Sequence, residues 1–158
     1  MLKFQANNLS ENFIICKKLE IKGIRQYNKN GELFYNIDNI IKICKEKEND
    51  SFIKYIGLIL NEPRTDLIKI FFINFGKDFL INKLLKTCEI ENKGGMKKKL
   101  INNNSKEIFE RKSPGGVFLN LIKNDEESKN LFKKIIKKDL KEKRERKKIY
   151  KSLEKLEI

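Results

Sequence analysis

The stretch Lys112–Asn124 reads KSPGGVFLNLIKN and is the most informative part of this 158-residue sequence. Ser113 followed by Pro114 predicts a helix start, because a serine side chain caps the first turn and proline fits the first helical position. Apolar residues then recur at helical spacing and predict a buried stripe: Val117, Phe118, Leu121 and Ile122. The segment is therefore expected to form a short amphipathic helix with a glycine-rich entrance, ending at Asn124.

Residues 51–91, which lie upstream of this segment, are expected to form three short helices. Their apolar residues repeat every three or four positions, as in helices that bury one face. Ser51 is a predicted N-cap for the first helix, and Thr65 with Asp66 is predicted to start the second. Gly76 is expected to end that second helix, because glycine adopts the left-handed conformation that follows many helices.

The first 50 residues are less regular. The turn residues Asn28–Gly31 lie between Ile24–Tyr27 and Leu33–Tyr35 and predict a β-hairpin. The spacing of the apolar residues over 37–44 predicts a helix after it. Residues 1–50 are expected to form an arm or a small subdomain.

The last helix is expected to begin near Asp125–Glu127, because carboxylates suit the positive end of a helix dipole. Its middle, Lys141–Lys148, contains no apolar residue, so this part is expected to run into solvent. Ile149, Leu153 and Leu156 then form a late apolar stripe. The fold class expected is mainly all-α, with a helical domain over 51–140 and a basic helical extension over 141–158.

Residues 92–112 interrupt the helical pattern and are predicted to form a long basic loop. Gly94-Gly95 and Asn102–Ser105 are turn-forming sequences, and Lys97–Lys99 makes the segment positively charged. A loop of this length in a compact domain is usually functional or disordered.

The charge of the chain indicates a polyanionic or acidic partner. The formal charge is +14 and the pI is near 9.6, with a net +3 over residues 92–127 and +8 over 128–158. There is no histidine, and the three cysteines, Cys16, Cys44 and Cys88, are widely spaced. This composition argues against zinc, excludes histidine-based catalysis, and favours reduced, buried thiols in an intracellular protein. No apolar run is long enough to span a membrane, and no signal peptide is expected.

Three motifs resemble one known family. Asn61–Ile68, NEPRTDLI, resembles its E/K-P-x-x-D-L-I element, and Glu89–Met96, EIENKGGM, resembles its E-V-E-x-x-G-G-L/M element. Pro114–Asn124 matches its signature P-G-G-V-F-L-N-L-[LI]-K-N almost letter for letter. The family is the RNA-binding domain of phosphorylated adapter RNA export protein, PHAX, and the resemblance covers roughly residues 50–140.

The resemblance implies a small all-helical domain that binds single-stranded RNA with little sequence preference. Members of the family adapt capped small nuclear RNA to the nuclear cap-binding complex and to an exportin with Ran-GTP. The resemblance therefore implies a nuclear protein that shuttles to the cytoplasm. We expect a monomer that needs no cofactor, does not associate with a membrane and has no enzymatic activity.

The residues themselves give a physical route to RNA binding. Backbone N–H groups at the Gly115-Gly116 helix entrance lack intrahelical partners, so a phosphate can approach them. Lysines and arginines nearby in the sequence supply phosphate contacts that position a strand without reading its bases. The residues expected to contact RNA are Arg64, Lys93, Lys97, Lys98, Lys99, Arg111, Lys112, Ser113, Gly115, Gly116, Asn120 and Lys123.

Several of these features have an alternative interpretation. The two glycines also fit close helix packing, Phe118 fits either the core or base stacking, and Asn120 is a candidate hydrogen-bonding partner for a base or sugar. Lys141–Lys148 fits a solvated helix face, an RNA contact or a nuclear localisation signal. The spacing over Phe13–Ile21 fits an export signal or core packing.

Two other function classes compete with RNA binding. The first is an interaction scaffold that docks on acidic partners through the basic C-terminal helix and its late apolar stripe. The second is an RNA-processing enzyme, but Asp66 and Asp78 form no metal-binding pair in the sequence and are explained as helix starts.

Overall fold

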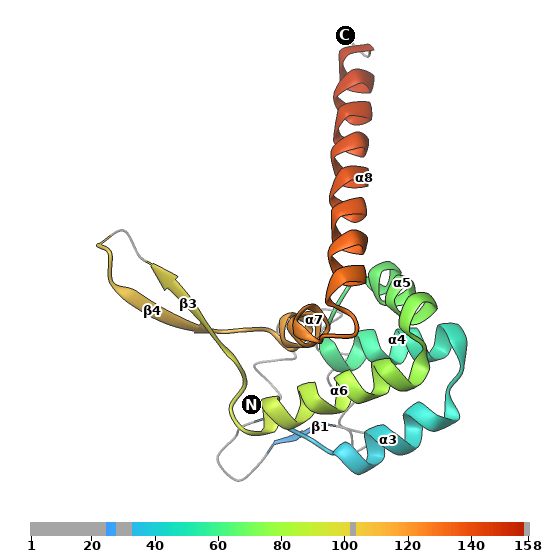
Figure 1. Cartoon of the computed structure of the whole chain (residues 1–158), viewed down its shortest axis with the longest axis vertical. Coiled ribbons are helices and arrows are strands. Elements are labelled where there is room, and N and C mark those ends of the chain that lie inside the picture. Colours follow the sequence, from blue (N-terminus) through green and yellow to red (C-terminus); the bar gives the residue numbers. More distant parts are fainter. Residues whose placement is uncertain (1–24, 28–32, 102–103, 157–158) are drawn as a thin grey trace, which may run out of the picture. The chain divides into compact units, whose positions relative to one another are not determined.

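The fold is mainly all-α, as predicted. A computed structural model describes residues 25–27, 33–101 and 104–156. Within those ranges the elements, labelled in Figure 1, are β1 (Arg25–Tyr27), β2 (Leu33–Tyr35), α3 (Ile37–Glu46), α4 (Asn49–Leu60), α5 (Thr65–Phe75), α6 (Lys77–Asn92), β3 (Lys97–Ile101), β4 (Glu107–Arg111), α7 (Pro114–Asn124) and α8 (Lys129–Leu156). The chain groups into two units, 1–121 and 122–158.

The core of the first unit is built from helices α3 to α6. Contacts join α4 to α5, α3 to α6, α5 to α6, and β2 to α6. The three helices predicted over 51–91 are confirmed as α4, α5 and α6, and their apolar faces are buried at residues such as Phe52, Phe71 and Leu84. Ring packing adds to this core, since Phe75 and Phe79 of neighbouring helices have centroids 4.8 Å apart.

The predicted helix ends are confirmed in part. Gly76 separates α5 from α6 and has φ +86°, a conformation that favours glycine. The prediction of Ser51 as an N-cap is wrong, because α4 begins at Asn49 and the cap residue is Glu48. The Ser51 amide instead donates to the Glu48 carbonyl inside the first turn.

The hairpin predicted near the N-terminus is confirmed by the antiparallel pairing of β1 with β2. Its turn, Asn28–Gly31, and the segment Phe13–Ile21 with Cys16 lie outside the described residues. Tyr35 ties β2 to the helices: its backbone N–H donates to the Asn92 side chain at 2.7 Å, and its hydroxyl donates to the Ile59 carbonyl at 3.2 Å. The helix predicted after this hairpin is confirmed as α3.

The prediction of a long loop over residues 92–112 is wrong, because most of this segment is a second β-hairpin. Strands β3 and β4 pair antiparallel from Lys97 opposite Arg111 to Ile101 opposite Glu107. Ser105 adopts φ +58° between the strands, as residues in tight turns often do. The turn-forming residues predicted from sequence therefore flank and connect two strands.

The second unit contains the end of α7 and the 28-residue helix α8. Helix α8 begins at Lys129, near the predicted start, but Asp125–Glu127 do not form its first turn, because residues 126–128 form a separate turn before it. The Asp125 carboxylate caps this turn by accepting from the Glu127 amide at 2.9 Å. Ser128 is buried and donates its hydroxyl proton to the Ile122 carbonyl at 2.7 Å.

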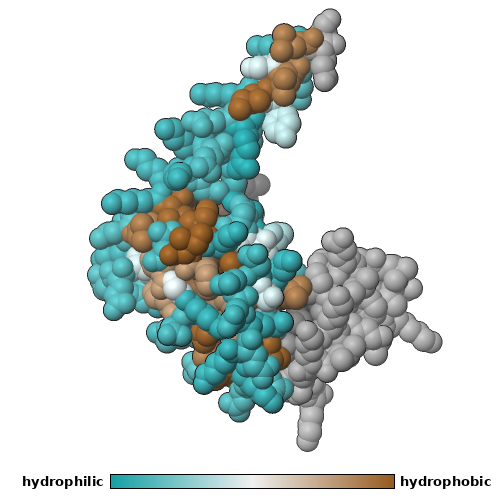
Figure 2. All heavy atoms as spheres, turned by 90° about the vertical axis from the view of Figure 1, so that its right-hand side faces the viewer, coloured by the Kyte–Doolittle hydropathy of each residue, from teal (hydrophilic) through white to brown (hydrophobic). Residues whose placement is uncertain are grey.

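Helix α8 changes character along its length. Phe132 and Ile135 near its start are buried, whereas its described residues from Lys141 onward are all exposed. Figure 2 shows hydrophobic side chains gathered at its C-terminal end beyond a hydrophilic stretch, where Ile149, Leu153 and Leu156 are exposed. None of the described helices has the length and apolar character needed to cross a membrane.

Candidate nucleic-acid interface

The β3–β4 hairpin places the predicted lysines Lys97, Lys98 and Lys99 on an open surface. Every residue of both strands is exposed, so neither face of the hairpin is covered by the rest of the described chain. Residues 93–112 carry seven basic and two acidic side chains, a net charge of +5. The segment is therefore a concentrated cationic surface, as phosphate binding requires.

The strand register divides the hairpin into two faces. Side chains of paired residues lie on the same face and alternate along each strand. Lys97 is paired with Arg111, and Lys99 with Phe109, so these four side chains share one face. The opposite face carries two further pairs, Lys98 with Glu110 and Leu100 with Ile108.

Lys99 is partly neutralised by a neighbour on its own face. Its ammonium nitrogen lies 2.7 Å from a carboxylate oxygen of Glu107, and both side chains are more than half exposed. An ion pair this exposed contributes little to stability and exchanges readily for another anion. Lys99 therefore stays accessible to a phosphate.

The base of the hairpin is fixed by an ion pair between β4 and α6. The Arg111 guanidinium donates to the Glu91 carboxylate at 2.7 Å, and the Glu91 side chain is only 5% exposed. Gly95 makes room for this contact, because a Cβ on it would clash with Nε of Arg111. We refer to Glu91, Gly95 and Arg111 as the hairpin clamp. Arg111 thus has a structural partner, which sequence reasoning missed.

The clamp is continuous with the end of α6. The Gly95 amide donates to the Ile90 carbonyl at 2.9 Å, and both Gly94 and Gly95 have positive φ. Lys93 is the exposed C-cap residue of α6, where a cation is favoured by the helix dipole. At the other strand the Lys112 amide donates to the Met96 carbonyl at 2.7 Å, which extends the pairing by one step.

The entrance of α7 forms as predicted, but its glycine lies against an acidic side chain. Pro114 opens the helix, and the Ser113 hydroxyl accepts from the Gly116 amide at 3.1 Å. Gly115 is buried, and a Cβ on it would lie 2.7 Å from Oε2 of Glu62. A carboxylate at a helix N-terminus is electrostatically favoured, so Glu62 takes the position that a phosphate would approach. This geometry favours the packing interpretation of Gly115.

Arg64, at the start of α5, is engaged in a bidentate ion pair. Its guanidinium donates to both carboxylate oxygens of Asp66, at 3.1 and 2.8 Å. Hydrogen bonding from Arg64 is the main cause that lowers the pKa of Asp66. The positive charge of Arg64 is therefore partly compensated.

The remaining predicted residues lie along α7. Phe118 is 1% exposed and belongs to the core together with Val117 and Ile122, whereas Leu121 of the predicted buried stripe is only half-buried. Asn120 is half-buried and has an interaction partner within the protein. Lys123 is exposed in the last turn of α7.

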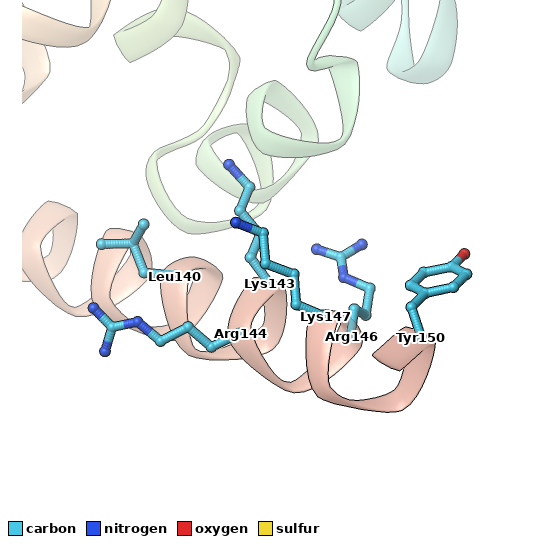
Figure 3. Close-up of a pocket in the computed structure, with 6 residues that line it drawn as sticks. All are labelled: Leu140, Lys143, Arg144, Arg146, Lys147 and Tyr150. Atoms are coloured by element: carbon cyan, nitrogen blue, oxygen red, sulfur yellow. The ribbon is translucent and has the colours of Figure 1, made fainter. Parts of the chain in front are cut away.

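Helix α8 forms a second cationic surface within residues 122–158. Figure 3 shows a shallow hollow lined by residues of one stretch of this helix: Leu140, Lys143, Arg144, Arg146, Lys147 and Tyr150. Lys143 and Lys147 lie one turn apart and project from the same side of the helix. This surface combines several cations with an exposed aromatic ring.

The described residues offer little for catalysis. Asp66 and Asp78 lie in the first turns of α5 and α6, and no group of three or more Cys, Asp or Glu side chains in the described ranges is placed to hold a metal ion. Burial raises the pKa of the Cys44 thiol to about 11 and that of Cys88 to about 12. Both thiols are thus poor nucleophiles at neutral pH.

Comparison with known proteins identifies the family. The model of the RNA-binding domain of phosphorylated adapter RNA export protein matches residues 52–150. The chain belongs to this PHAX family. It is 36% identical over 95 residues to the protein of that name from Rattus norvegicus, which covers 57% of this chain and 23% of the relative. The Homo sapiens protein is 35% identical over 96 residues, 58% of this chain and 23% of the relative.

The match to the PHAX relatives therefore spans less than a quarter of their length. No solved structure matches this chain significantly. Two contacts involve these motifs: Glu62 of the first lies against Gly115 of the third, and Glu91 of the second holds Arg111, three residues before the third. Part of the PHAX signature is therefore explained by packing.

Proposed function

We propose that this chain binds single-stranded RNA with little sequence preference, mainly through the β3–β4 hairpin, as an adapter in the export or handling of small nuclear RNA. The observation that carries this proposal is the exposure of both strands in a segment of net charge +5. Membership of the PHAX RNA-binding domain family supports RNA as the polyanion. The relatives' name, RNA export protein, supports the role in export.

In this proposal the predicted residues have different roles in RNA binding. Lys97, Lys98 and Lys99 bind phosphates directly, and Lys93 and Lys112 extend this surface at the hairpin base. Arg64, Asn120 and Lys123 are secondary contacts. The other predicted positions act mainly by holding the hairpin and the α7 entrance in place: Arg111, Ser113, Gly115 and Gly116. The proposal involves no cofactor and no catalysis.

The wider role follows the family and is part of the same proposal. The chain acts in the nucleus and shuttles to the cytoplasm, with the nuclear cap-binding complex and an exportin with Ran-GTP as protein partners. Crosslinking and sequencing of the RNA bound in cells tests this role. Enrichment of small nuclear RNA is expected, and recovery of unselected transcripts alone would contradict it.

Charge reversal at Lys97, Lys98 and Lys99 tests the hairpin. Each phosphate contact changes the logarithm of affinity by about 0.7 per decade of salt for a single strand, so three contacts correspond to about 100-fold in affinity near 0.1 M salt. Because reversal to Glu also adds three repulsive charges, we expect the triple variant to lose at least this factor, from a starting dissociation constant of about 1–100 µM. The measurement is fluorescence anisotropy of a labelled oligonucleotide across a salt series.

The matched control reverses three exposed lysines on the helices, Lys42, Lys54 and Lys86. It changes the net charge by the same amount, so it reports the effect of overall charge alone. An equal loss in both variants would show that the hairpin is not the site. A wild-type affinity that does not change with salt would contradict phosphate binding altogether.

A second candidate function rests on α8. Exposed Ile149, Leu153 and Leu156 beyond the basic run suit a protein with an apolar groove and an acidic rim. Deletion of residues 141–158 separates the two functions. Loss of a protein partner with RNA affinity retained favours the scaffold, whereas a parallel loss of RNA affinity assigns α8 to RNA.

A further inference from the structure

Phe109 is an exposed aromatic ring in the middle of the cationic hairpin. Its side chain is 61% exposed although it lies within a β-strand, and an exposed phenylalanine forfeits the gain from burial. Lys99 is its cross-strand partner, and Lys97 and Arg111 lie on the same face one step nearer the hairpin base. An aromatic ring flanked by cations is the arrangement that single-strand binding proteins use.

Lysines alone do not account for a preference for single strands. Phosphate contacts position a nucleic acid without reading its bases, and a duplex offers phosphates at least as densely. A preference for unpaired RNA requires a group that contacts the face of an unstacked base. Phe118, the aromatic residue of the α7 signature, is 1% exposed and cannot provide that contact.

The position of Phe109 distinguishes it from the other exposed aromatic ring described in residues 1–121. Phe34 in β2 is 44% exposed, but its cross-strand partner is the uncharged Gln26. Phe109 faces Lys99, and Lys97 lies two residues further along the same strand, about 7 Å away. That distance is close to the spacing of successive phosphates in an extended single strand.

We propose that Phe109 stacks on an unpaired RNA base while Lys97 and Lys99 hold the phosphates beside it. The inference rests on the proposed function and adds the group that recognises a base. Stacking tolerates any sequence because every base has a π-face, so this site selects unpaired strands without selecting a sequence. On binding, Lys99 exchanges its solvent-exposed partner Glu107 for a phosphate.

The test uses Phe109→Trp as a reporter. The natural sequence contains no tryptophan, so this variant has a single indole, placed at the proposed stacking position. It is titrated with a labelled oligouridylate and with an abasic strand of the same length and charge. Indole fluorescence reports stacking, and anisotropy of the labelled strand reports binding.

We expect oligouridylate to quench the indole and the abasic strand to leave it unchanged while binding about tenfold more weakly. Equal binding of both strands with no quenching would overturn the stacking proposal and leave RNA binding intact. Failure of both strands to bind would overturn the proposed function together with this one. The two failures are therefore distinguishable.

Substitution of the ring provides a second test. Phe109→Ala should weaken oligouridylate binding about tenfold with the thermal midpoint unchanged, because the exposed ring contributes little to the core, and Phe109→Tyr should retain the affinity. Phe34→Ala is the matched control and should leave affinity unchanged. An equal loss in both alanine variants overturns the proposal. So does a Phe109→Ala variant that abolishes self-association in sedimentation velocity while RNA affinity is retained.

Discussion

The β3–β4 hairpin and the entrance of α7 share one sequence feature but have different surroundings. Each has a pair of glycines with lysines close by, and from sequence both are expected to belong to one RNA-binding element. In the structure the hairpin strands are exposed throughout. At the α7 entrance, Gly115 is buried against the carboxylate of Glu62.

Although the two regions differ in exposure, one glycine of each pair has the same use in this chain. Gly95 lets the Arg111 guanidinium reach buried Glu91, and Gly115 lets Glu62 approach the first turn of α7. Both glycines admit an interaction within the protein. Of the two contacts, the Arg111–Glu91 pair fixes the base of the hairpin, and the exposed strands of the hairpin are the surface left for a ligand. Three predictions test this division of roles.

The largest effect is expected at the hairpin clamp. Arg111→Ala leaves the Glu91 carboxylate buried without its cation, which we expect to lower the free energy of unfolding by about 2 kcal/mol, less than for a fully buried pair because Arg111 is 53% exposed. Urea denaturation provides the measurement. Lys98→Ala, at an exposed position of the partner strand, is the control and should change stability by no more than about 0.5 kcal/mol.

A double-mutant cycle with Glu91→Gln isolates the contact itself. If the ion pair fixes the hairpin, the double variant should be about 1 kcal/mol more stable than the sum of the single effects indicates. Strict additivity would show that Arg111 and Glu91 act independently, and that their ion pair does not fix the hairpin.

A smaller effect is expected at the α7 entrance. Gly115→Val should destabilise the protein by about 1–2 kcal/mol, because the new side chain must displace the Glu62 carboxylate. The mobile end of Glu62 moderates this effect. Gly116→Val is the control for valine in the same turn: a Cβ there meets no atom of Glu62, and its close contact, 3.2 Å, is with Oγ of Ser113, so its cost includes the adjustment of that cap.

Removal of the crowding side chain should rescue Gly115→Val. In a Glu62→Ala background, Gly115→Val should lower the free energy of unfolding measurably less. If no phosphate binds at Gly115, the RNA affinity of folded Gly115→Val should differ from that of the wild type by less than about threefold. A large loss of RNA affinity in Gly115→Val with stability retained would show that the α7 entrance is part of the RNA-binding site.

The helices could be predicted from sequence because their signals are local. The stripe Val117, Phe118 and Ile122 repeats at helical spacing, and Ser113-Pro114 marks a start that the structure reproduces within a residue. The same reasoning predicted α4, α5 and α6. Where it was wrong, at Ser51, the helix begins two residues earlier without a side-chain cap.

The second hairpin could not be predicted in the same way. The alternating pattern of a strand appears in sequence only when one face is buried, and neither face of β3 or β4 is. The contacts that fix the candidate site were also invisible, because they join separate segments: Glu91 lies twenty residues from Arg111, and Glu62 lies further still from Gly115. The sequence shows how many charges the segment carries, but it does not show which of them form ion pairs within the protein.

The smallest effect should distinguish the two faces of the hairpin. Glu107 shares a face with Phe109 and pairs with Lys99, whereas Glu110 lies on the opposite face across from Lys98. Glu107→Gln and Glu110→Gln remove the same charge from the same strand. We expect Glu107→Gln to raise RNA affinity about two- to threefold, because it frees Lys99 beside the proposed stacking site, and to change stability by less than about 0.5 kcal/mol. Anisotropy titrations at low salt should show a smaller gain for Glu110→Gln; an equal gain would show that the RNA does not favour the Phe109 face, and a larger gain would place it on the other face.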